Sequence, residues 1–504
     1  MDQFWQCVNE GQHGRYALDL LQCGLNIGND FIWTWLVFVL VGVGLFFTFT
    51  TGFVQIRLLW RSVTEMLGSR SDGDDEHGHG ITPFQAFVTG LASRVGTGNI
   101  AGVAIAISVG GPGAVFWMWL TALLGMSSAF AESSLAQLFK IRDHGNNQFR
   151  GGPAYYITRG LGQKWLGVIF ALSLILCFGF VFNAIQANTI VESIKSASGC
   201  AAGSGACEND WNTYKHVLGV ALVIVTAPII FGGIRRVSRI SEALVPVMAS
   251  AYLLMALYVM MTHISAVPTM FSLIVDNAFN FSSAAGGFAG SAIAAAMQQG
   301  IKRGLFSNEA GMGSAPNAAA AADVKHPVSQ GMIQMLGVFV DTIIVCSCTA
   351  FIILLSDVQT AGSSLTGSQL TQAALESHVG VFGQYFLAMV LFMFCYSSII
   401  GNYAYAESNM QFIKNGRLTL VFFRMVVLAF VYFGSVVKVG LVWDMGDFSM
   451  GIMAFINLIA IVILCPLVFM LLKDYQSKVR MGKEPVFKLS EHPTLKRKIK
   501  SDIW

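Results

Sequence analysis

The chain has 504 residues, of which 54% are hydrophobic and only 12% are charged. Soluble proteins carry about 25% charged residues, so this composition excludes a soluble domain and predicts a polytopic membrane protein with about ten to twelve spans. The net charge is +3, and the sequence contains no phosphate-binding loop, HExxH, GxSxG or dinucleotide fingerprint, which argues against an ATP-driven pump or a membrane protease.

The N-terminal segment, residues 1–30, is polar and lacks the basic start of a signal peptide. We therefore expect an extracytoplasmic segment followed by a retained first span, Phe31–Phe53, within an extra transmembrane helix at 31–55. An acidic, Gly-rich stretch follows at Ser71–Gly80. We interpret its His77-Gly78-His79 sequence as a solvated loop, because no Cys/His cluster with metal-ligand spacing accompanies it.

The second span, Pro83–Val109, contains an unusual stretch, Arg94–Gly102. Thr82 and Pro83 predict a helix start, with Thr as the cap and Pro in the first turn. The glycines of Arg94–Gly102 disfavour a continuous helix, because Gly costs roughly 1 kcal/mol relative to Ala. An arginine at membrane depth costs at least about 2.5 kcal/mol unless it is paired or hydrated. Close packing of small residues is one interpretation; a helix break that exposes backbone groups to a bound solute is the one we favour.

Nine further hydrophobic segments bring the expected number of spans to eleven. In chain order they are Gly113–Phe139, Trp165–Ile194, His216–Gly232, Ile240–Met261, Phe281–Ala322, Gly331–Leu355, Phe382–Ala406, Leu418–Val436 and Leu441–Leu472. The segment Phe281–Ala322 is too long and too rich in Gly and Ala for one simple span.

Lysine and arginine are distributed unevenly over the expected loops. With the N-terminus outside, 23 of them lie in cytoplasmic loops and in the basic tail 473–504, and only 4 lie outside. This positive-inside bias predicts an odd number of spans and a cytoplasmic C-terminus. Cys7, Cys23, Cys200 and Cys207 then lie outside, where the sequence leaves open which of them form disulfides, Cys200–Cys207 and Cys7–Cys23 among the pairings.

The second half of the chain repeats the unusual stretch of the second span. Arg94–Gly102 and Arg303–Gly311 both read Arg, four residues, Asn, one residue, Ala, Gly, at a constant offset of 209 positions. At the same offset, Glu132 in the third span corresponds to Asp341 in the eighth. A coincidence of small-residue packing is the alternative, but five matched positions in one register favour an internal repeat.

The two copies lie five spans apart, which places them in opposite orientations. We therefore predict an inverted repeat of two five-helix units, residues 83–261 and residues 281–472. Inverted repeats with discontinuous helices at equivalent places are typical of secondary transporters. A half-helix that begins near Asn99 offers N–H groups suited to a carboxylate. Carbonyl groups freed around Ala92–Val95 can replace the water of a Na⁺ ion, and such irregular backbone is tolerated only where it is buried or lines a cavity.

The chain also resembles a known family. The stretch Gly110–Gly125, GGPGAVFWMWLTALLG, together with Gly96–Val103 and Arg303–Gly311, is similar to the bacterial and archaeal alanine or glycine:cation symporters, the sodium:alanine symporter family. The resemblance extends from about residue 30 to residue 475. It implies an all-α membrane protein of 11 transmembrane helices with a leucine-transporter-type fold, in which one extra helix precedes an inverted 5+5 repeat. It also implies Na⁺-coupled, sometimes H⁺-coupled, uptake of small neutral amino acids.

The resemblance assigns the substrate carboxylate to the break in the second span. The residues that would bind it are Gly96, Thr97, Gly98 and Asn99. Asn99 is in addition a candidate ligand of the Na⁺ ion nearest the substrate.

A second Na⁺ site, as in related folds, would use main-chain and hydroxyl oxygens. Its expected ligands are the carbonyls of Ala92 and Val95 and the hydroxyls of Ser397 and Ser398 in the ninth span. The alternative for the two serines is hydrogen bonding to the preceding turn of their own helix.

One departure from the family concerns specificity. Members that transport alanine usually read Phe-x-Phe-Thr-Thr-x-Ile-Gly-Trp in the ninth span, whereas this chain reads FCYSSIIGN over Phe394–Asn402. Asn402 thus replaces a bulky indole, and Ala406 lies one turn further on the same face. If Ser398, Asn402 and Ala406 line the pocket, it is wider and more polar than an alanine pocket, so that glutamine or another larger neutral amino acid becomes a serious substrate.

Two acidic residues fall inside spans. We expect Glu132 and Asp341 to form structural or gating ion pairs with Arg94, Lys302 or Arg303, because pairing is the usual way in which intramembrane charges are accommodated; a proton relay is the alternative.

Several amides also lie within spans. Gln298 and Gln299 immediately precede the second break, where a side chain either reaches the substrate or ties helices together. Asn183 and Gln186 in the fourth span have the same two interpretations.

These features predict a multi-pass symporter of the bacterial cytoplasmic (inner) membrane, and not an enzyme. Na⁺ is the expected coupling ion, with H⁺ as the alternative, and no organic cofactor is implied. The expected partners are a small neutral amino acid, such as alanine or glycine, and the lipid bilayer; no nucleic acid is expected, and a single chain should suffice. The alternatives are a glutamine-preferring symporter of the same family, a non-transporting amino-acid sensor, and a channel, against which a repeat within one chain argues.

Overall fold

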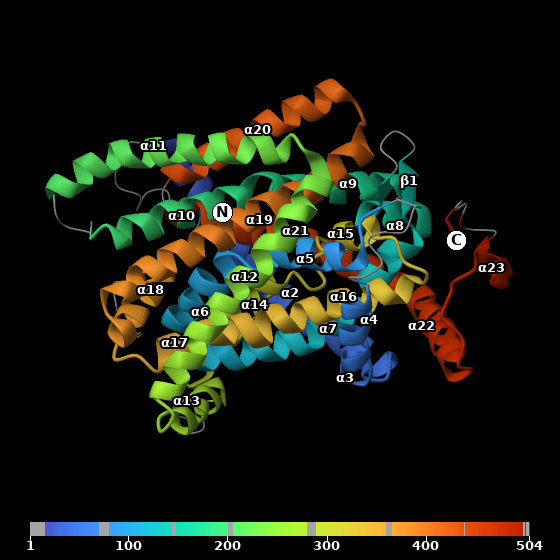
Figure 1. Cartoon of the computed structure of the whole chain (residues 1–504), viewed down its shortest axis with the longest axis horizontal. Coiled ribbons are helices and arrows are strands. Elements are labelled where there is room, and N and C mark those ends of the chain that lie inside the picture. Colours follow the sequence, from blue (N-terminus) through green and yellow to red (C-terminus); the bar gives the residue numbers. More distant parts are fainter. Residues whose placement is uncertain are drawn as a thin grey trace.

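The computed structural model describes residues 16–69, 80–143, 148–199, 205–279, 289–358, 365–437, 439–496, 499 and 503–504. Within this part the chain is helical apart from one small hairpin of two strands. Figure 1 shows the long helices running across the molecule, with β1, α8, α22 and the C-terminus at one end and α13 and α18 toward the other. The loop that contains His77 and His79 lies outside the described residues.

The first helix, α2, extends over Tyr16–Thr50 and begins earlier than the sequence predicted. It packs against α7 (Gly113–Leu138) and α21 (Val439–Ile463), and the buried indole of Trp33 donates a hydrogen bond to the Asp447 carbonyl at 3.2 Å. The helix therefore stands beside both halves of the chain rather than inside either.

The second span is broken, as predicted. Its first part, α5 (Pro83–Arg94), begins with a capping box in which Thr82 and Gln85 each bind the other's main-chain N–H, at 3.1 and 3.2 Å. Its second part consists of the short π-helix η2 (Gly98–Gly102) and α6 (Val103–Gly110). The two parts are bent by 51°.

The remaining elements of the first half follow the predicted order. They are α3 (Val54–Arg57), α4 (Leu59–Gly68), α7, β1 (Ile141–Asp143), β2 (Gln148–Arg150), α8 (Pro153–Gly160), α9 (Lys164–Leu174), η3 (Ile175–Phe182), α10 (Asn183–Ala197), α11 (Gly205–Ile230), α12 (Gly233–Thr262) and α13 (Val267–Phe279). The strands pair antiparallel, with Ile141 opposite Arg150. The elements α9, η3 and α10 together form one continuous span, Lys164–Ala197.

The second half contains the second broken helix. It consists of α14 (Ala289–Asn308), α15 (Pro316–Ala321), α16 (Pro327–Val338), η5 (Phe339–Cys346), α17 (Ser347–Leu354), α18 (Gly367–Val379), α19 (Val381–Ile413), α20 (Arg417–Val436), α21, α22 (Cys465–Arg480), η6 (Leu489–Glu491) and α23 (Pro493–Lys496). The interruption between α14 and α15 contains Glu309, at φ 59°, and Gly311 and Gly313, at φ 82° and 83°. In both halves the helix therefore breaks at the repeated sequence.

Within the described residues, nine helices are long and apolar enough to cross a membrane, and the bent pair α5 and η2–α6 makes ten. Ten of the eleven expected spans are thus present. The other, at Phe281–Ala322, corresponds to α14 and α15, which are interrupted and rich in Gly, Ala and polar residues, so the expected count of eleven is not confirmed by apolar length.

Glycines allow the helices that carry the breaks to pack closely. A Cβ on Gly300 of α14 would lie 2.4 Å from the Ala114 carbonyl oxygen of α7, and one on Gly401 of α19 would lie 2.9 Å from the Ser93 nitrogen of α5. The main chains of neighbouring helices therefore approach each other closely, as is usual where small residues line the interface between membrane helices.

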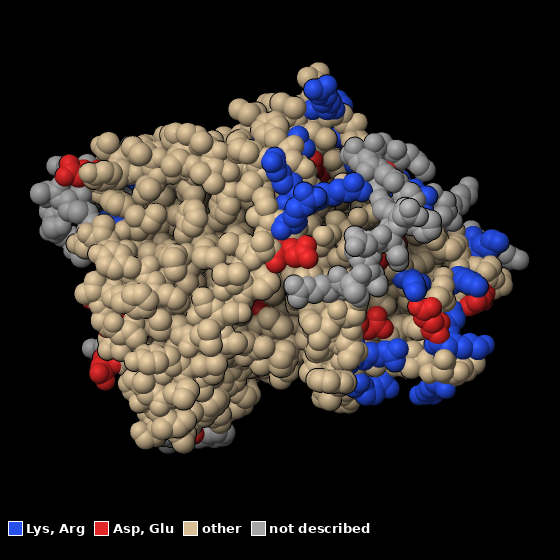
Figure 2. Space-filling model, in the orientation of Figure 1, with Lys and Arg blue, Asp and Glu red and all other residues tan. Residues whose placement is uncertain are grey.

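The charged side chains are concentrated at one end of the molecule. In Figure 2 the lysines and arginines lie over the right-hand half of the visible face, toward the end that carries α8 and α22, whereas the left-hand half shows almost none. A large surface almost free of charge, with the basic residues gathered toward one end, is typical of a membrane protein.

The cysteines fall into two groups. Cys23 is disulfide-bonded. Cys7 and Cys200 lie outside the described residues, as does the side chain of Cys207, so the pairing is not specified. The cysteines of the spans are free thiols: Cys177, Cys346, Cys348, Cys395 and Cys465.

Candidate substrate and ion site

The first break is a short stretch of extended chain held by side-chain amides. Val95 has φ −77° and ψ 92°, so α5 ends there. The N–H of Gly96 donates to Asn99 Oδ1 at 2.8 Å. Both the N–H and the hydroxyl of Thr97 donate to Gln186 Oε1 of α10, at 3.0 and 2.7 Å. The N–H groups of Gly96 and Thr97, which the sequence predicted to be available to a carboxylate, are thus held by the neutral oxygens of two amides.

At Gly96, in the middle of the break, there is no room for a side chain. A Cβ there would lie 2.2 Å from Ser398 Oγ and 2.9 Å from Gln186 Oε1. The absence of a side chain therefore allows α10 and α19 to reach the break together.

Oxygen atoms from α5 and α19 converge next to the break. Ser398 Oγ lies within hydrogen-bond distance of the carbonyl oxygens of Ala92 and Val95, at 3.0 and 3.2 Å. Ser397 Oγ lies 3.4 Å from the Ala92 carbonyl oxygen. Both hydroxyls also contact the Phe394 carbonyl of the preceding turn, at 2.8 and 3.0 Å. The structure thus brings together all four residues predicted for the second Na⁺ site. The two serines both approach the carbonyls of α5 and bond to the preceding turn of their own helix, so the contacts of both interpretations are present.

Three carbonyls and two hydroxyls form this cluster, and all are uncharged oxygen donors of the kind that hard cations prefer. The Phe394 carbonyl was missed from the sequence, because a main-chain carbonyl gives no signal in residue type. Its position one turn before the serines is the feature that could have indicated it.

A buried carboxylate joins the two breaks on the other side of Gly98. Asn99 Nδ2 donates to Asp341 Oδ1 at 2.6 Å, and the hydroxyls of Ser307 and Thr342 donate to Asp341 Oδ2, both at 2.8 Å. A Cβ on Gly98 would lie 3.1 Å from Ser307 Cα, so the two broken helices touch here. Asp341 therefore supplies negative charge beside Asn99, where the substrate-side Na⁺ was expected.

The second break is held by the matching carboxylate of the repeat. Glu132 of α7 accepts hydrogen bonds from the N–H groups of Gly311 and Gly313, at 3.2 and 3.1 Å, and from Asn457 Nδ2 at 2.7 Å. The carboxylate thus binds backbone groups that the left-handed glycines expose.

The expected ion pairs of Glu132 and Asp341 are wrong. Within the described residues neither carboxylate has a cationic partner at salt-bridge distance, because each is satisfied by N–H, amide or hydroxyl donors at a break. Arg303 instead forms a two-pronged pair with Asp447 of α21, both contacts at 3.0 Å, and Lys302 Nζ lies 2.7 Å from the same carboxylate.

Arg94, the buried cation at the end of α5, has no carboxylate within salt-bridge distance among the described residues. It is buried, and its Nη1 donates to the Gln334 carbonyl at 3.3 Å, while Nε and Nη2 have no hydrogen-bond partner.

Ser398, Asn402 and Ala406, the residues of α19 predicted to contact the substrate side chain, have different neighbours in the structure. Asn402 Oδ1 accepts from Ser93 Oγ at 2.7 Å, and the same hydroxyl lies 2.7 Å from Glu309 Oε1 of the second break. Asn402 Nδ2 is buried with no hydrogen-bond partner. Ala406 packs instead against Gly179 of η3, where an added Cβ would be 3.1 Å from Ala406 Cβ. Ser398 and Asn402 thus lie at the break, and Ala406 lies against η3.

The other amides have different roles. Gln186 contacts the break, as described above, whereas Asn183 Nδ2 donates to Gly179 within its own helix at 3.0 Å. Gln298 is half-buried on α14 and makes no side-chain hydrogen bond to the described residues. An aromatic side chain that the sequence did not single out, Phe306, covers Gly98 at 2.9 Å from an added Cβ. A phenylalanine in an apolar span carries no functional signal by itself.

Comparison with known proteins identifies relatives along nearly the whole chain. A model of the sodium:alanine symporter family matches residues 18–489. The chain is 48% identical to the amino-acid carrier protein AlsT of Bacillus subtilis (strain 168), over 95% of this chain and 97% of that protein. It is 46% identical to the probable sodium/glutamine symporter GlnT of the same organism, over 93% of each.

Among solved structures, the chain is similar to MhsT in complex with L-phenylalanine. The TM-score is 0.54 at 13% identity, over 77% of this chain and 97% of that one. At this identity the similarity shows the fold alone, and it confirms the expected helical architecture of leucine-transporter type.

Proposed function

Because the chain belongs to the sodium:alanine symporter family, we propose that it is a Na⁺-coupled symporter that takes up neutral amino acids by alternating access. Family membership supports sodium coupling and amino-acid transport, and excludes an enzyme. The observation that carries the proposal is the cluster of uncharged oxygens, from Ala92, Val95, Phe394, Ser397 and Ser398, directly beside a helix break.

In this proposal one Na⁺ binds between α5 and α19. The carbonyls of Ala92, Val95 and Phe394 and the hydroxyls of Ser397 and Ser398 replace its water. The hydroxyl protons, which now point at carbonyls, turn outward, since a cation requires lone pairs. The ion thereby adds a further link between α5 and α19, which already contact each other at Ser93 and Asn402.

The amino acid binds at the break itself, between Gly96 and Asn99. Its carboxylate takes the place of the Gln186 amide oxygen at the Thr97 N–H and hydroxyl, because a charged acceptor forms the stronger hydrogen bonds. Asn99 and the Asp341 carboxylate provide oxygens for a second Na⁺ next to that carboxylate. Each positive charge strengthens binding of the carboxylate, and this coupling free energy is what symport requires.

The two breaks are the centres of the proposed inverted repeat, 83–261 and 281–472. Glu132 and Asp341, at the same place in each unit, each bind groups at the break of the opposite unit. Alternating access would then be a relative movement of packed bundles around this pair of breaks. A single chain contains the complete arrangement.

The basic end of the molecule in Figure 2 faces the cytoplasm in this proposal, with the N-terminus outside. The membrane is the bacterial cytoplasmic membrane. An inside-negative potential of 100 mV then contributes roughly 2.3 kcal/mol for each charge moved inward.

Glutamine is the second candidate substrate beside alanine and glycine. The buried Nδ2 of Asn402 has no partner, and a buried donor without a partner costs about 1–3 kcal/mol. A substrate with a side-chain carbonyl would satisfy it, whereas a methyl group would not. The 46% identity to a probable sodium/glutamine symporter supports the same choice.

Uptake of radiolabelled amino acids into proteoliposomes tests the proposal. We expect saturable accumulation when a Na⁺ gradient is imposed and none without it, with competition by alanine, glycine, serine or glutamine identifying the substrate. Flux that does not saturate would indicate a channel, and binding without flux would indicate a sensor; either result contradicts the proposal.

A further inference from the structure

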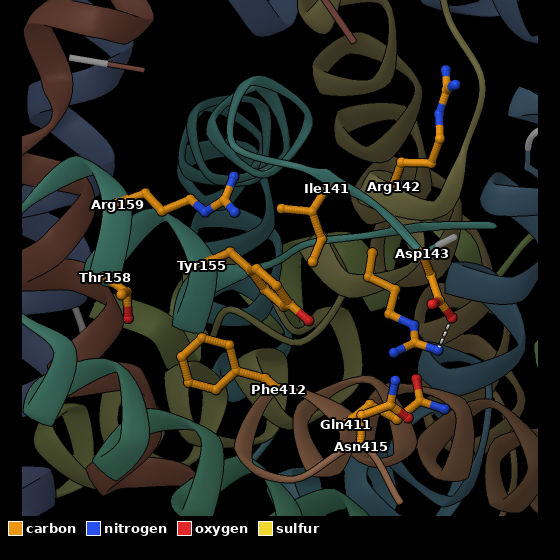
Figure 3. Close-up of a pocket in the computed structure, with 10 residues that line it drawn as sticks. Ile141, Arg142, Asp143, Tyr155, Thr158, Arg159, Gln411, Phe412 and Asn415 are labelled. Atoms are coloured by element: carbon orange, nitrogen blue, oxygen red, sulfur yellow. Dashed lines mark hydrogen bonds and ion pairs between the residues drawn. The ribbon is translucent and has the colours of Figure 1, made fainter. Parts of the chain in front are cut away.

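A cavity of about 480 Å³ lies away from both breaks, at the basic end of the molecule. Figure 3 shows it between the β1–β2 hairpin, helix α8 and the last turn of α19. The side chains that line it include Asp143, Arg150, Tyr155, Arg159, Gln411 and Asn415. The cavity has no part in the proposed binding of substrate or Na⁺, so its polar lining requires a separate explanation.

The charges of the lining do not balance. Asp143 binds Arg150 in a short contact across the hairpin. Arg159 is exposed on α8 and has no hydrogen bond or ion pair to the described residues. Figure 3 shows Arg159 on the opposite side of the cavity from the Asp143–Arg150 pair, so the lining carries one positive charge beyond that pair. Figure 3 shows the Arg142 side chain extending away from the others, so it is not counted here.

Neutral hydrogen-bond donors complete the lining. The ring of Tyr155 is fixed edge-on against Phe412 of α19, with the ring centres 5.0 Å apart, and its hydroxyl points into the cavity in Figure 3. Burial raises the pKa of Tyr155 to about 12, so the phenol keeps its proton and remains a donor. The amide group of Gln411, in the last turn of α19, and that of Asn415, just after this helix, point toward the same space.

The surroundings place the cavity at a membrane surface. After α8 and a short loop, the next helix α9 begins with Lys164 and Trp165, and α20, which follows Asn415 and Gly416, begins with Arg417 and Leu418. The side chains of Trp165 and Leu418 are 62% and 86% exposed. Exposed apolar side chains next to Lys and Arg are typical of the interface between the hydrocarbon and the headgroups.

We propose that this cavity binds a phosphate group carrying one negative charge, the charge of a phosphodiester. Arg159 and Arg150 hold its oxygens, Tyr155 and the amides of Gln411 and Asn415 donate the remaining hydrogen bonds, and the exposed apolar neighbours hold acyl chains when the phosphate belongs to a phospholipid. Arginine suits such a group because its donors match the geometry of phosphate oxygens. Basic pockets at the cytoplasmic ends of membrane helices commonly bind lipid headgroups.

The position of the site connects it to transport. The hairpin and α8 follow α7, which carries Glu132, and the end of α19 belongs to the helix that carries Ser397 and Ser398. An occupant that bridges α8 and α19 fixes the distance between these two helices. The cytoplasmic location and the effect on transport rest on the proposed function, whereas binding of the phosphate does not.

Native mass spectrometry of the delipidated full chain, titrated with phosphatidylglycerol, tests the site. We expect one tightly bound lipid in the wild-type protein. Arg159→Gln should weaken its binding about tenfold or more, because a charge-assisted hydrogen bond is lost, and Tyr155→Phe should weaken it by a smaller factor. Arg159 is exposed, so its substitution should not affect folding, and Arg480→Gln on α22 is the matched control at the same end of the molecule.

Separate arms identify the source of the phosphate. Inorganic phosphate that displaces the lipid from the wild-type protein, and that itself binds more weakly to Arg159→Gln, would assign the site to a soluble phosphate. Uncharged diacylglycerol should not bind. Equal lipid binding by Arg159→Gln, Arg480→Gln and the wild-type protein would overturn the proposal.

A transport assay separates this proposal from the proposed function. In liposomes with and without phosphatidylglycerol, the wild-type protein should transport faster with the anionic lipid, and Arg159→Gln should lose this difference. Specific lipid binding without any amino-acid uptake would refute the proposed function and leave the phosphate site intact. Normal uptake without specific lipid binding would do the reverse.

Discussion

Gly96 shows how a single missing side chain allows the site to form. A Cβ in place of one Gly96 hydrogen would clash with both Ser398 Oγ of α19 and Gln186 Oε1 of α10. The residues for substrate and ion therefore come from three helices that meet at one glycine.

Substitution of this glycine should strongly reduce transport. In Gly96→Ala the added methyl would lie 2.2 Å from Ser398 Oγ, so that either this hydroxyl turns away or α19 moves, and in both cases its contacts with the Ala92 and Val95 carbonyls are lost. We expect Na⁺-driven uptake to fall at least about tenfold, as small displacements at a binding constellation commonly cause.

Gly102→Ala is the matched control for this change. The nearest atoms to a Cβ at Gly102 are 3.9 Å away, an ordinary contact distance. Uptake by Gly102→Ala should stay close to that of the wild-type protein. Equal loss in both variants would mean that helix flexibility, and not the contact with Ser398, is what Gly96 provides.

Asn402 should decide which side chains the transporter accepts. In Asn402→Trp an indole fills the space next to Ser93, so competition by glutamine should weaken about tenfold or more while alanine still competes. Asn402→Leu keeps the branched shape and the number of heavy atoms and removes the amide, which separates shape from hydrogen bonding. Unchanged competition by glutamine in both variants would show that Asn402 does not face the substrate.

At the scale of elements, each broken helix is held by a carboxylate from elsewhere in the chain. Glu132 binds the backbone of the second break through two N–H groups. In Glu132→Gln one of the two side-chain atoms becomes a donor and can no longer accept, so one buried N–H loses its partner. We expect the free energy of unfolding to fall by about 1–3 kcal/mol, measured as a lower melting temperature in detergent.

The control for Glu132→Gln is a carboxylate in an exposed pair. Glu484 is 63% exposed where it binds Lys325, and such pairs contribute only about 0–1 kcal/mol. A melting temperature for Glu132→Gln no lower than that for Glu484→Gln would contradict the role given to Glu132.

The sequence was sufficient to predict both breaks and the cap at Thr82, whereas the convergence of Ala92, Val95, Ser397 and Ser398 was expected only from the family resemblance. Glycine and asparagine are costly inside helices, so their repetition at a fixed offset marks a place where the helix is not continued. Periodicity and hydropathy likewise located the other spans, because a bilayer imposes length and composition on them.

The partners of the buried charges could not be predicted in this way. Opposite charges suggested pairing of Glu132 and Asp341 with arginines, but main-chain N–H groups and amides at the breaks satisfy them instead. Which donors a carboxylate binds depends on how the helices pack. Every residue except proline has a main-chain N–H, so residue type does not indicate which N–H groups are available. For the same reason Phe394 was missed, and Asp447 was not recognised as the partner of Arg303.

The end of α7 holds a buried lysine that should make stability depend on pH. Lys140 Nζ donates to the Ala322 carbonyl at 2.8 Å and lies over the rings of Phe149 and Trp504, 4.1 and 5.0 Å from their centres. Burial lowers the pKa of Lys140 to about 7. In the unfolded chain a lysine has a pKa of about 10.4. At a pH between these two pKa values, Lys140 therefore takes up a proton when the protein unfolds.

Stability contributed by this group should therefore rise as the pH increases from about 7 toward 10. Melting temperatures of the wild-type protein and of Lys140→Met, recorded from pH 6 to pH 9, should run parallel below about pH 7, with the wild-type protein gaining relative to the variant above it. Parallel curves over the whole range would show that Lys140 keeps its ordinary pKa in the folded protein.

At the scale of the whole molecule, the two halves of the chain share one site. Gly98 of the first break touches Ser307 of the second, and Asp341 binds residues of both. The extra helix α2 stands outside this arrangement, against α7 and α21, and Lys302 and Arg303 fasten α14 to α21 through Asp447. In the proposed transport cycle, a movement that opens the site to one side would therefore separate the bundles around these breaks rather than bend one helix alone.

Coupling between ion and amino acid is the central claim, and the flux of Na⁺ itself tests it most directly. Proteoliposomes are loaded without Na⁺, and entry of radioactive Na⁺ is measured before and after the transported amino acid is added outside. Our account predicts that the amino acid accelerates Na⁺ entry in the wild-type protein and that Ser398→Ala, which removes a hydroxyl beside the Ala92 and Val95 carbonyls, loses most of this acceleration. Amino-acid uptake that proceeds with no accompanying entry of Na⁺ would contradict it.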